Sequence, residues 1–226
     1  MKQVVLLVEG QTEEQFVKEV LAPGWEPRLY LQPIVISTKK GGQARKDKGG
    51  TVTKERTIKE CKRLLAQTHW TKVVLVLDYY GLHLSFGKKQ TKGIPHERAK
   101  EIRDSFEREI DDGRFRFFLL IHEFEALLFS DPESIAAHFA NDKDSSKEKA
   151  LRELQAILDD HDNDPERIND HPSTAPSKRL ESLFPRFKKV SDGVVIAKAI
   201  GIKRIRQRCR AFNELCACLD ECAASD

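Results

Sequence analysis

The chain has 226 residues, of which 39% are hydrophobic and 33% are charged. A chain of this length and composition can bury a sizeable core, which excludes disorder over most of its length. No run of 18 apolar residues occurs, and the apolar stretch at residues 4–8 is too short for the core of a signal peptide. We therefore expect no membrane association and a cytoplasmic location.

The net charge of +3 is distributed unevenly. Residues 38–56 carry seven Lys and Arg against two acids, and residues 198–210 carry six bases and no acid. Residues 130–170, in contrast, hold twelve acids and five bases. This alternation of basic and acidic regions says more about binding partners than the total charge does.

Apolar runs and turn residues predict the elements in chain order. Strands are expected at residues 4–8, 28–36, 73–77 and 115–121, and the first and third are apolar on both faces. Helices are expected at residues 12–21, capped by Thr12, at 51–67 and at 97–110. From residue 126 the pattern stays helical apart from acidic linkers around 141–146 and 159–164, and one helix is expected over 202–219.

This order predicts an α/β fold with a mostly parallel four-stranded sheet flanked by helices. Residues 1–130 would form the α/β domain, and residues 131–226 an α-rich region packed on it. Five cysteines do not make a disulfide framework in such a chain. Cys216, Cys218 and Cys222 fit either buried thiols of a helix or a zinc site, and their Ala- and Leu-containing surroundings favour the thiols.

Acidic residues follow three of the four expected strands. Glu9 follows the first, Asp78 the third, and Glu123 and Glu125 the fourth. Function gathers beyond the carboxyl ends of parallel strands, and Mg²⁺ prefers carboxylate oxygens. The acids therefore indicate a Mg²⁺ or Mn²⁺ site for phosphodiester cleavage, although each one alone could instead cap a neighbouring helix.

Several motifs carry a family resemblance. The string Val8-Glu9-Gly10-Gln11-Thr12-Glu13 after an apolar strand, with a later strand closing on Asp78, resembles the TOPRIM domain of topoisomerases, bacterial primases and overcoming-lysogenization-defect (OLD) nucleases. Its Glu-Gly-x-Thr-Glu form is most similar to the OLD type. Further strings resemble an uncharacterised bacterial family of TOPRIM-like proteins, known only as a domain of unknown function, over almost the whole chain: Asp78-Tyr79-Tyr80-Gly81, His122-Glu123-Phe124-Glu125-Ala126-Leu127-Leu128-Phe129, Ala175-Pro176-Ser177-Lys178-Arg179 and Cys209-Arg210-Ala211-Phe212-Asn213.

The resemblance implies a TOPRIM-like (Rossmannoid) fold and roles for single residues. Glu9 matches the TOPRIM glutamate, a metal ligand or general acid/base, and Asp78 matches the first aspartate of the Asp-x-Asp motif. The second aspartate is replaced by Tyr80. Glu13 could supply a ligand, as in the OLD pattern, and Glu123 or Glu125 could replace the lost carboxylate. On a helix these two would project about 200° apart, so both can face one metal only where the backbone is not yet helical.

Two further side chains stand beside these acids. His122 could shuttle protons near neutral pH, or it could hydrogen-bond a carboxylate and fix the end of the strand. Tyr80 could stack on a base or hydrogen-bond a phosphate or carboxylate; a covalent tyrosine nucleophile is the less favoured alternative.

Basic residues suggest where a polyanion would bind. A glycine-rich loop at residues 38–50 has a composition suited to following a phosphate chain, or it is a solvated loop, and it contributes Lys39, Lys40, Arg45, Lys46 and Lys48. Lys178 and Arg179 follow Pro176 at an expected helix start, which favours an anion.

The sequence thus leads to two main hypotheses, with nucleotidyl transfer of the primase kind as a third, less favoured one. The first is a Mg²⁺-dependent nuclease that cleaves DNA or RNA, with a role in phage defence beside a partner ATPase suggested only by analogy with OLD nucleases. The second is a non-catalytic TOPRIM-like module that binds nucleic acid or an ATPase, and the missing second aspartate supports it.

Overall fold

The structure is a computed structural model that describes residues 1–36, 52–87, 95–140, 144–168 and 173–224. Its sheet has four strands: β1 (Lys2–Val8), β2 (Leu29–Val35), β3 (Lys72–Asp78) and β4 (Phe115–Leu120). The strand order is β2-β1-β3-β4, and all three pairings are parallel. The predicted parallel α/β sheet is therefore confirmed.

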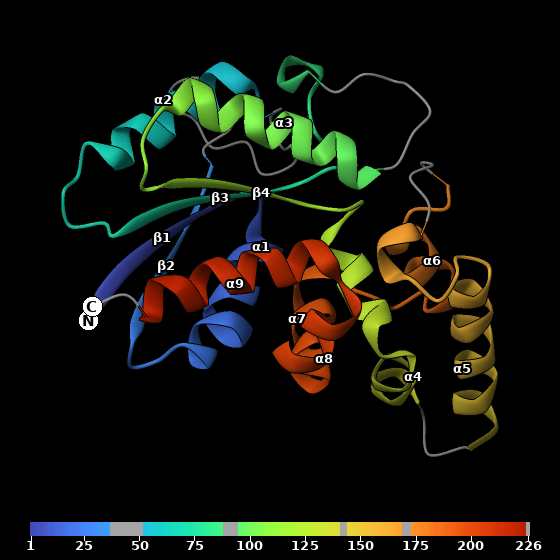
Figure 1. Cartoon of the computed structure of the whole chain (residues 1–226). Helices are drawn as coiled ribbons and strands as arrows, with labels where there is room; N and C mark the ends of the chain where they lie inside the picture. Colours follow the sequence, from blue (N-terminus) through green and yellow to red (C-terminus); the bar gives the residue numbers. More distant parts are fainter. Residues whose placement is uncertain (37–51, 88–94, 141–143, 169–172, 225–226) are drawn as a thin grey trace, which may run out of the picture.

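Helices cover both faces of this sheet (Figure 1). On one face lie α2 (Lys54–Leu65) and α3 (Pro95–Ile110). The other face is covered by α1 (Gln11–Phe16), its π-helical continuation η1 (Val17–Leu21) and the C-terminal helix α9 (Arg210–Ala224). The remaining elements are the 3-10 helices η2 (Ala22–Gly24), η3 (Leu84–Phe86), η4 (Phe124–Ser130) and η5 (Pro165–Arg167), and the α-helices α4 (Pro132–Phe139), α5 (Asp144–Asp159), α6 (Pro176–Leu183), α7 (Lys189–Ile200) and α8 (Ile202–Arg208).

Strand β1 shows how the apolar runs specify this two-sided burial. Residues 4–8 have no exposed surface, because Val4, Leu6 and Val8 face one core and Val5 and Leu7 face the other. The first of these cores also contains side chains of the C-terminal helices. Burying such side chains is worth roughly 1.5–3 kcal/mol each.

The C-terminal region shares this first core with the α/β part. Phe16 of α1 packs edge-on against Phe124 of η4 and Phe212 of α9, with ring centroids 5.1 and 5.8 Å apart. Each such aromatic pair adds about 0.5–1.5 kcal/mol beyond area burial. A domain division at residue 130 stays a prediction, since elements from both sides of it build one core.

Several sequence-based boundaries were wrong. The helix expected over 51–67 is α2, which begins at Lys54 with Thr53 at its N-cap. The first helix begins at Gln11 with Gly10, rather than Thr12, at its N-cap. Helix α5 begins at Asp144, inside the stretch that was expected to be a linker.

The helix expected over 202–219 is divided at Cys209, whose backbone is extended (φ −120°, ψ 108°). Glu166 of η5 causes this break, because its carboxylate accepts hydrogen bonds of 2.8 Å from the backbone N–H groups of Arg210 and Ala211 and so caps a new helix, α9.

Candidate metal centre

The carboxyl edge of the sheet, where the parallel strands end, holds the residues singled out by the sequence. From β1 the chain moves outward to β2 and then crosses to β3 on the other side of β1, so the strand order reverses between β1 and β3. Ligands of open α/β sheets bind at such a switch point. Glu9 directly follows β1, and Asp78 is the last residue of β3.

The acidic cluster comprises five carboxylates that meet around Asp78: Glu9, Glu13, Asp78, Glu123 and Glu125. Burial raises the pKa of Asp78 well above its ordinary range, and Glu13, Glu9, Glu125 and Glu123 raise it further by repulsion. Its Oδ1 atom is buried and accepts no hydrogen bond from the described residues. A buried carboxylate oxygen in this state is costly unless a cation or a proton compensates it.

Glu9 and Glu13 form the partly exposed side of the acidic cluster. Burial, and next the charge of Glu13, raises the pKa of Glu9, while the backbone N–H of Asp78 acts in the opposite direction. The pKa of Glu13 is also raised by burial, against the effect of nearby backbone N–H groups and of Lys189. The Glu9 carboxylate also lies beside Gly81, where an added Cβ would be 3.8 Å from Oε1.

A turn at His122 brings both acids that follow β4 into the cluster. His122 is buried and has a positive φ of 68°, a region in which His is enriched among non-glycine residues. Its carbonyl accepts a 2.8 Å hydrogen bond from the N–H of Tyr80. Glu123 is consequently still extended (φ −142°, ψ 162°), and the 3-10 helix η4 begins only after it. The backbone is thus extended at Glu123 and helical at Glu125, and the joint role of the two acids at one metal stays a prediction.

The two buried acids have different partners. Oε2 of Glu123 accepts a 3.1 Å hydrogen bond from the backbone N–H of Ser177 in the first turn of α6. Oε1 of Glu125 lies 3.4 Å from Nζ of Lys189, the first residue of α7. Burial raises the pKa of Glu125 to about 7, although Lys189 acts to lower it.

Lys189 is the residue of this site that sequence reasoning missed. Burial acts to lower its pKa, but Glu125, Glu123 and Asp78 outweigh that effect and leave the pKa raised, so Lys189 stays charged. A base in the first turn of a helix is unfavourable for the helix dipole, but the sequence pattern indicated a helix only from residue 194, so no signal for Lys189 was available before the structure placed it at the start of α7.

The other residues that the sequence singled out differ in their exposure and in their contacts. Tyr80 is partly exposed beside Asp78, whereas Tyr79 is buried in the core of the α2–α3 face. Lys178 is exposed and pairs with Glu181 at 2.6 Å, and Nε of Arg179 donates to the carbonyl of Thr174. The anion at the start of α6 is therefore Glu123 of this chain. The five loop bases, Lys39, Lys40, Arg45, Lys46 and Lys48, lie outside the described residues.

The donor set fits a hard divalent cation in chemistry, because it consists of carboxylate oxygens and includes the unbonded Oδ1 of Asp78. Among the described residues, however, no three His, Cys, Asp or Glu side chains already stand in a metal-binding arrangement. Cys216, Cys218 and Cys222 are buried free thiols of α9. No helix of the described chain is long and apolar enough to cross a membrane.

The fold and the acidic cluster define a doubly wound α/β protein with a carboxylate-rich switch point. The chain belongs to the family described as "Domain of unknown function (DUF4276)", whose model matches residues 8–220. No curated protein matches the chain. A solved structure, the C-terminal region of the OLD protein of Xanthomonas campestris pv. campestris, is similar at a TM-score of 0.35 and 16% identity, and the match covers 97% of this chain and 96% of that one.

Proposed function

We propose that the protein hydrolyses phosphodiester bonds of nucleic acid with a divalent cation, Mg²⁺ or Mn²⁺, held at the acidic cluster. The observation that carries this proposal is the convergence of four carboxylates around Asp78, the last residue of β3: Glu9 after β1, Glu13 of α1, and Glu123 and Glu125 at the start of η4. Oδ1 of Asp78 has no hydrogen bond from the described residues. Helix capping accounts for Glu123, and Glu13 also interacts with the backbone N–H groups at the start of its own helix, but neither contact involves Asp78. The TOPRIM resemblance of the Glu9 and Asp78 motifs supports the same reaction class.

Glu9, Glu13 and Asp78 would hold the cation on the partly exposed side, with Glu125 behind them. A bound divalent cation lowers the pKa of water and stabilises charge on phosphate oxygens. Because the carboxylates repel one another and do not yet form a metal-binding arrangement, binding requires that their side chains be drawn together.

Lys189 would serve the substrate as well as the cluster. Its side chain is 42% exposed while its ammonium lies against Glu125. A fixed positive charge at this place can attract a phosphate group toward the carboxylates and can stabilise the charge that develops on it during cleavage.

The test is a cleavage assay on single- and double-stranded DNA and RNA, with Mg²⁺ or Mn²⁺ and with chelator. We expect metal-dependent cleavage that Asp78→Asn and Glu9→Gln abolish. The matched control is Glu133→Gln, which removes an exposed acid of α4 outside the cluster and should leave cleavage unchanged. Cleavage that persists in chelator, or in Asp78→Asn, would refute the proposal.

The second candidate function is a non-catalytic TOPRIM-like module that binds nucleic acid or an ATPase. Tyr80 favours it, because the TOPRIM motif has a second aspartate at that position. The two candidates differ in metal affinity, which calorimetric titration of the wild type with Mn²⁺ measures directly. Nucleic-acid binding without metal binding or cleavage would select the module.

A further inference from the structure

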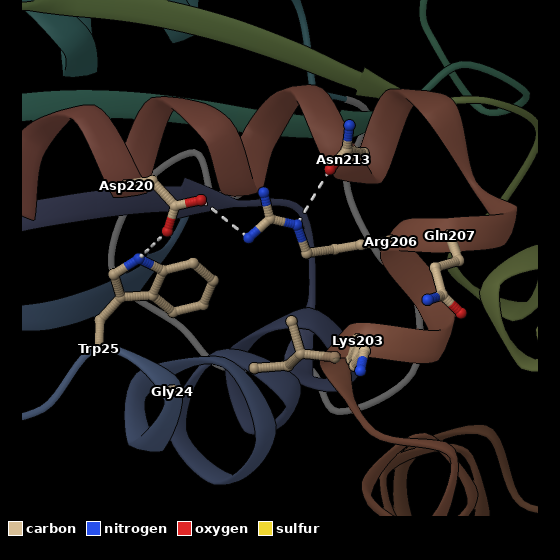
Figure 2. Close-up of a pocket in the computed structure, with 8 residues that line it drawn as sticks. Gly24, Trp25, Lys203, Arg206, Gln207, Asn213 and Asp220 are labelled. Atoms are coloured by element: carbon tan, nitrogen blue, oxygen red, sulfur yellow. Dashed lines mark hydrogen bonds and ion pairs between the residues drawn. The ribbon is translucent and has the colours of Figure 1, made fainter.

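A cavity of about 490 Å³ lies away from the acidic cluster, between η2, α8 and α9 (Figure 2). We call it the α8–α9 cavity; its lining residues are Gly24, Trp25, Ile202, Lys203, Arg206, Gln207, Asn213 and Asp220. Trp25 precedes β2, whose first residue pairs with Lys2 at the start of β1. The cavity is therefore near the edge where the strands begin, opposite the acidic cluster.

The guanidinium of Arg206 is held in one orientation at the cavity wall. Its Nε donates a 3.0 Å hydrogen bond to Oδ1 of Asn213, and its terminal nitrogen lies 2.8 Å from Oδ2 of Asp220. Trp25 fixes Asp220 in turn, because the indole Nε1 donates to Oδ1 at 3.0 Å. Figure 2 shows this chain of contacts from Trp25 to Asn213. A donor fixed in advance in this way loses little freedom when it binds a ligand.

Hydrogen-bonding capacity remains after these contacts. Arginine has five N–H donors, and the bonds to Asn213 and Asp220 leave three of them for a ligand. Lys203 and Gln207 lie one turn apart on α8, both exposed, and neither is bonded to the described part of the chain. The lining residues comprise two cations and one carboxylate, and both oxygens of that carboxylate are already engaged.

The rest of the cavity wall is formed by Gly24, Trp25 and Ile202. Gly24 lets η2 approach α8 closely, because an added Cβ would lie 2.8 Å from Cδ1 of Ile202. The cavity volume falls within the range of small-molecule sites and is far larger than one phosphate group requires.

From these features we propose that the α8–α9 cavity binds a small phosphomonoester of nucleotide size. Arg206 would engage the phosphate through its planar fork, Lys203 would supply the second positive charge, and the organic part would lie against Ile202. Asp220 offsets one of the two cations, so the lining carries a net charge of +1. The planar fork of Arg206 and the ammonium of Lys203 can each engage a different oxygen of a phosphate group, which carries about −1.5 to −2 charges at pH 7.

The test is calorimetric titration of the full chain in chelator with adenosine 5′-monophosphate, ribose 5-phosphate and adenosine. The chelator, and an Asp78→Asn background, keep the result independent of any metal-dependent binding at the acidic cluster. We expect saturable binding of at least one of the two phosphate compounds and none of adenosine. Adenosine binding as tightly as its monophosphate, or no binding of either phosphate compound at millimolar concentration, would overturn the proposal.

Variants locate the site. Lys203→Gln should weaken phosphate-compound binding about fivefold, as expected for one partly solvated charge contact. Arg206→Lys, which keeps the charge but loses the fork, should weaken it at least tenfold. The matched control is Arg204→Gln, which removes the same charge from the same helix outside the cavity and should change nothing. Lys203 takes no part in the wall contacts, so its variant stays folded. Equal effects of Lys203→Gln and Arg204→Gln would refute the assignment.

Discussion

Glu166 makes the stability of the protein depend on pH in a calculable way. Its side chain is 2% exposed, and it accepts hydrogen bonds from the first backbone N–H groups of α9. Burial raises its pKa from 4.5 to about 7 and outweighs the hydrogen bonds from Ala211 and Arg210, which act to lower it. His96 lies 3.4 Å away, but its own pKa is lowered, mainly by burial, so it is neutral above pH 6.5 and does not compensate the carboxylate.

The sign of the pH dependence of stability follows from the direction in which the pKa of Glu166 is shifted. Because the folded-state pKa lies above the unfolded one, the contribution of Glu166 is fully present below pH 4.5 and is lost as the pH rises through 7. A separation of 2.5 units corresponds to about 3 kcal/mol at most, of which about 2 kcal/mol falls between pH 5.5 and 8.5. The wild type should lose this amount over that range.

Other groups also titrate, so the measurement compares Glu166→Gln with its parent at both pH values. Both chains carry His96→Gln, which removes the neighbouring titration, and unfolding in urea is followed in chelator. We expect the difference in free energy of unfolding to move by about 2 kcal/mol in favour of Glu166→Gln when the pH rises from 5.5 to 8.5. A difference that is constant with pH, or that moves the other way, would refute the reasoning.

Three further predictions concern the proposed site. Asp78→Asn should raise the melting temperature in chelator, because it removes a buried charge from among four other acids, and Mg²⁺ should then stabilise the variant less than the wild type; a lower melting temperature would contradict this. Lys189→Met should destabilise the protein at pH 8 by about 1–2 kcal/mol in urea unfolding, since Glu125 loses its cation, whereas Lys188→Met, one residue away and exposed, should have no such effect. The third variant changes five bases to Gln: Lys39, Lys40, Arg45, Lys46 and Lys48. The slope of log binding constant against log salt concentration for duplex binding should fall in magnitude by about 0.9 for each phosphate that these bases neutralise in the wild type, while metal affinity stays the same. An unchanged slope would show that these bases do not contact the phosphates.

The fold could be predicted where the signal was local. The run Val4 to Val8 has no exposed surface, as its unbroken apolar character indicated, and residues 73–77 of β3 are at most 5% exposed. The break at Cys209 could not be found in this way. It depends on Glu166, more than forty positions earlier in the chain, whose carboxylate reaches the N–H groups of Arg210 and Ala211.

The residues of the candidate site differ in the same way: some could be predicted from local sequence and others could not. Glu9 and Asp78 could be placed together from the sequence because parallel strands end at one edge, and the structure brings them within electrostatic reach of each other. Lys189 could not be placed in the site from the sequence, since it does not follow a strand and its contact with Glu125 arises from the packing of α7 beside η4. The sequence could predict that an anion lies at the start of α6. It could not predict that this anion is Glu123, because the position of Glu123 depends on the turn at His122.

The dispersed origin of the acidic cluster has a consequence for the growing chain. Its carboxylates come from the residue after β1, from α1, from the end of β3 and from the start of η4, and the cation that faces Glu125 comes from the still later α7. Parallel strands pair slowly because they join distant segments, so the acids stay apart until most of the molecule has been synthesised and has folded. A ligand that needs all of them binds the finished protein and not its intermediates, and it thereby draws the folding equilibrium toward the native state. If a divalent cation binds at the cluster as proposed, its affinity would report whether these elements are correctly assembled.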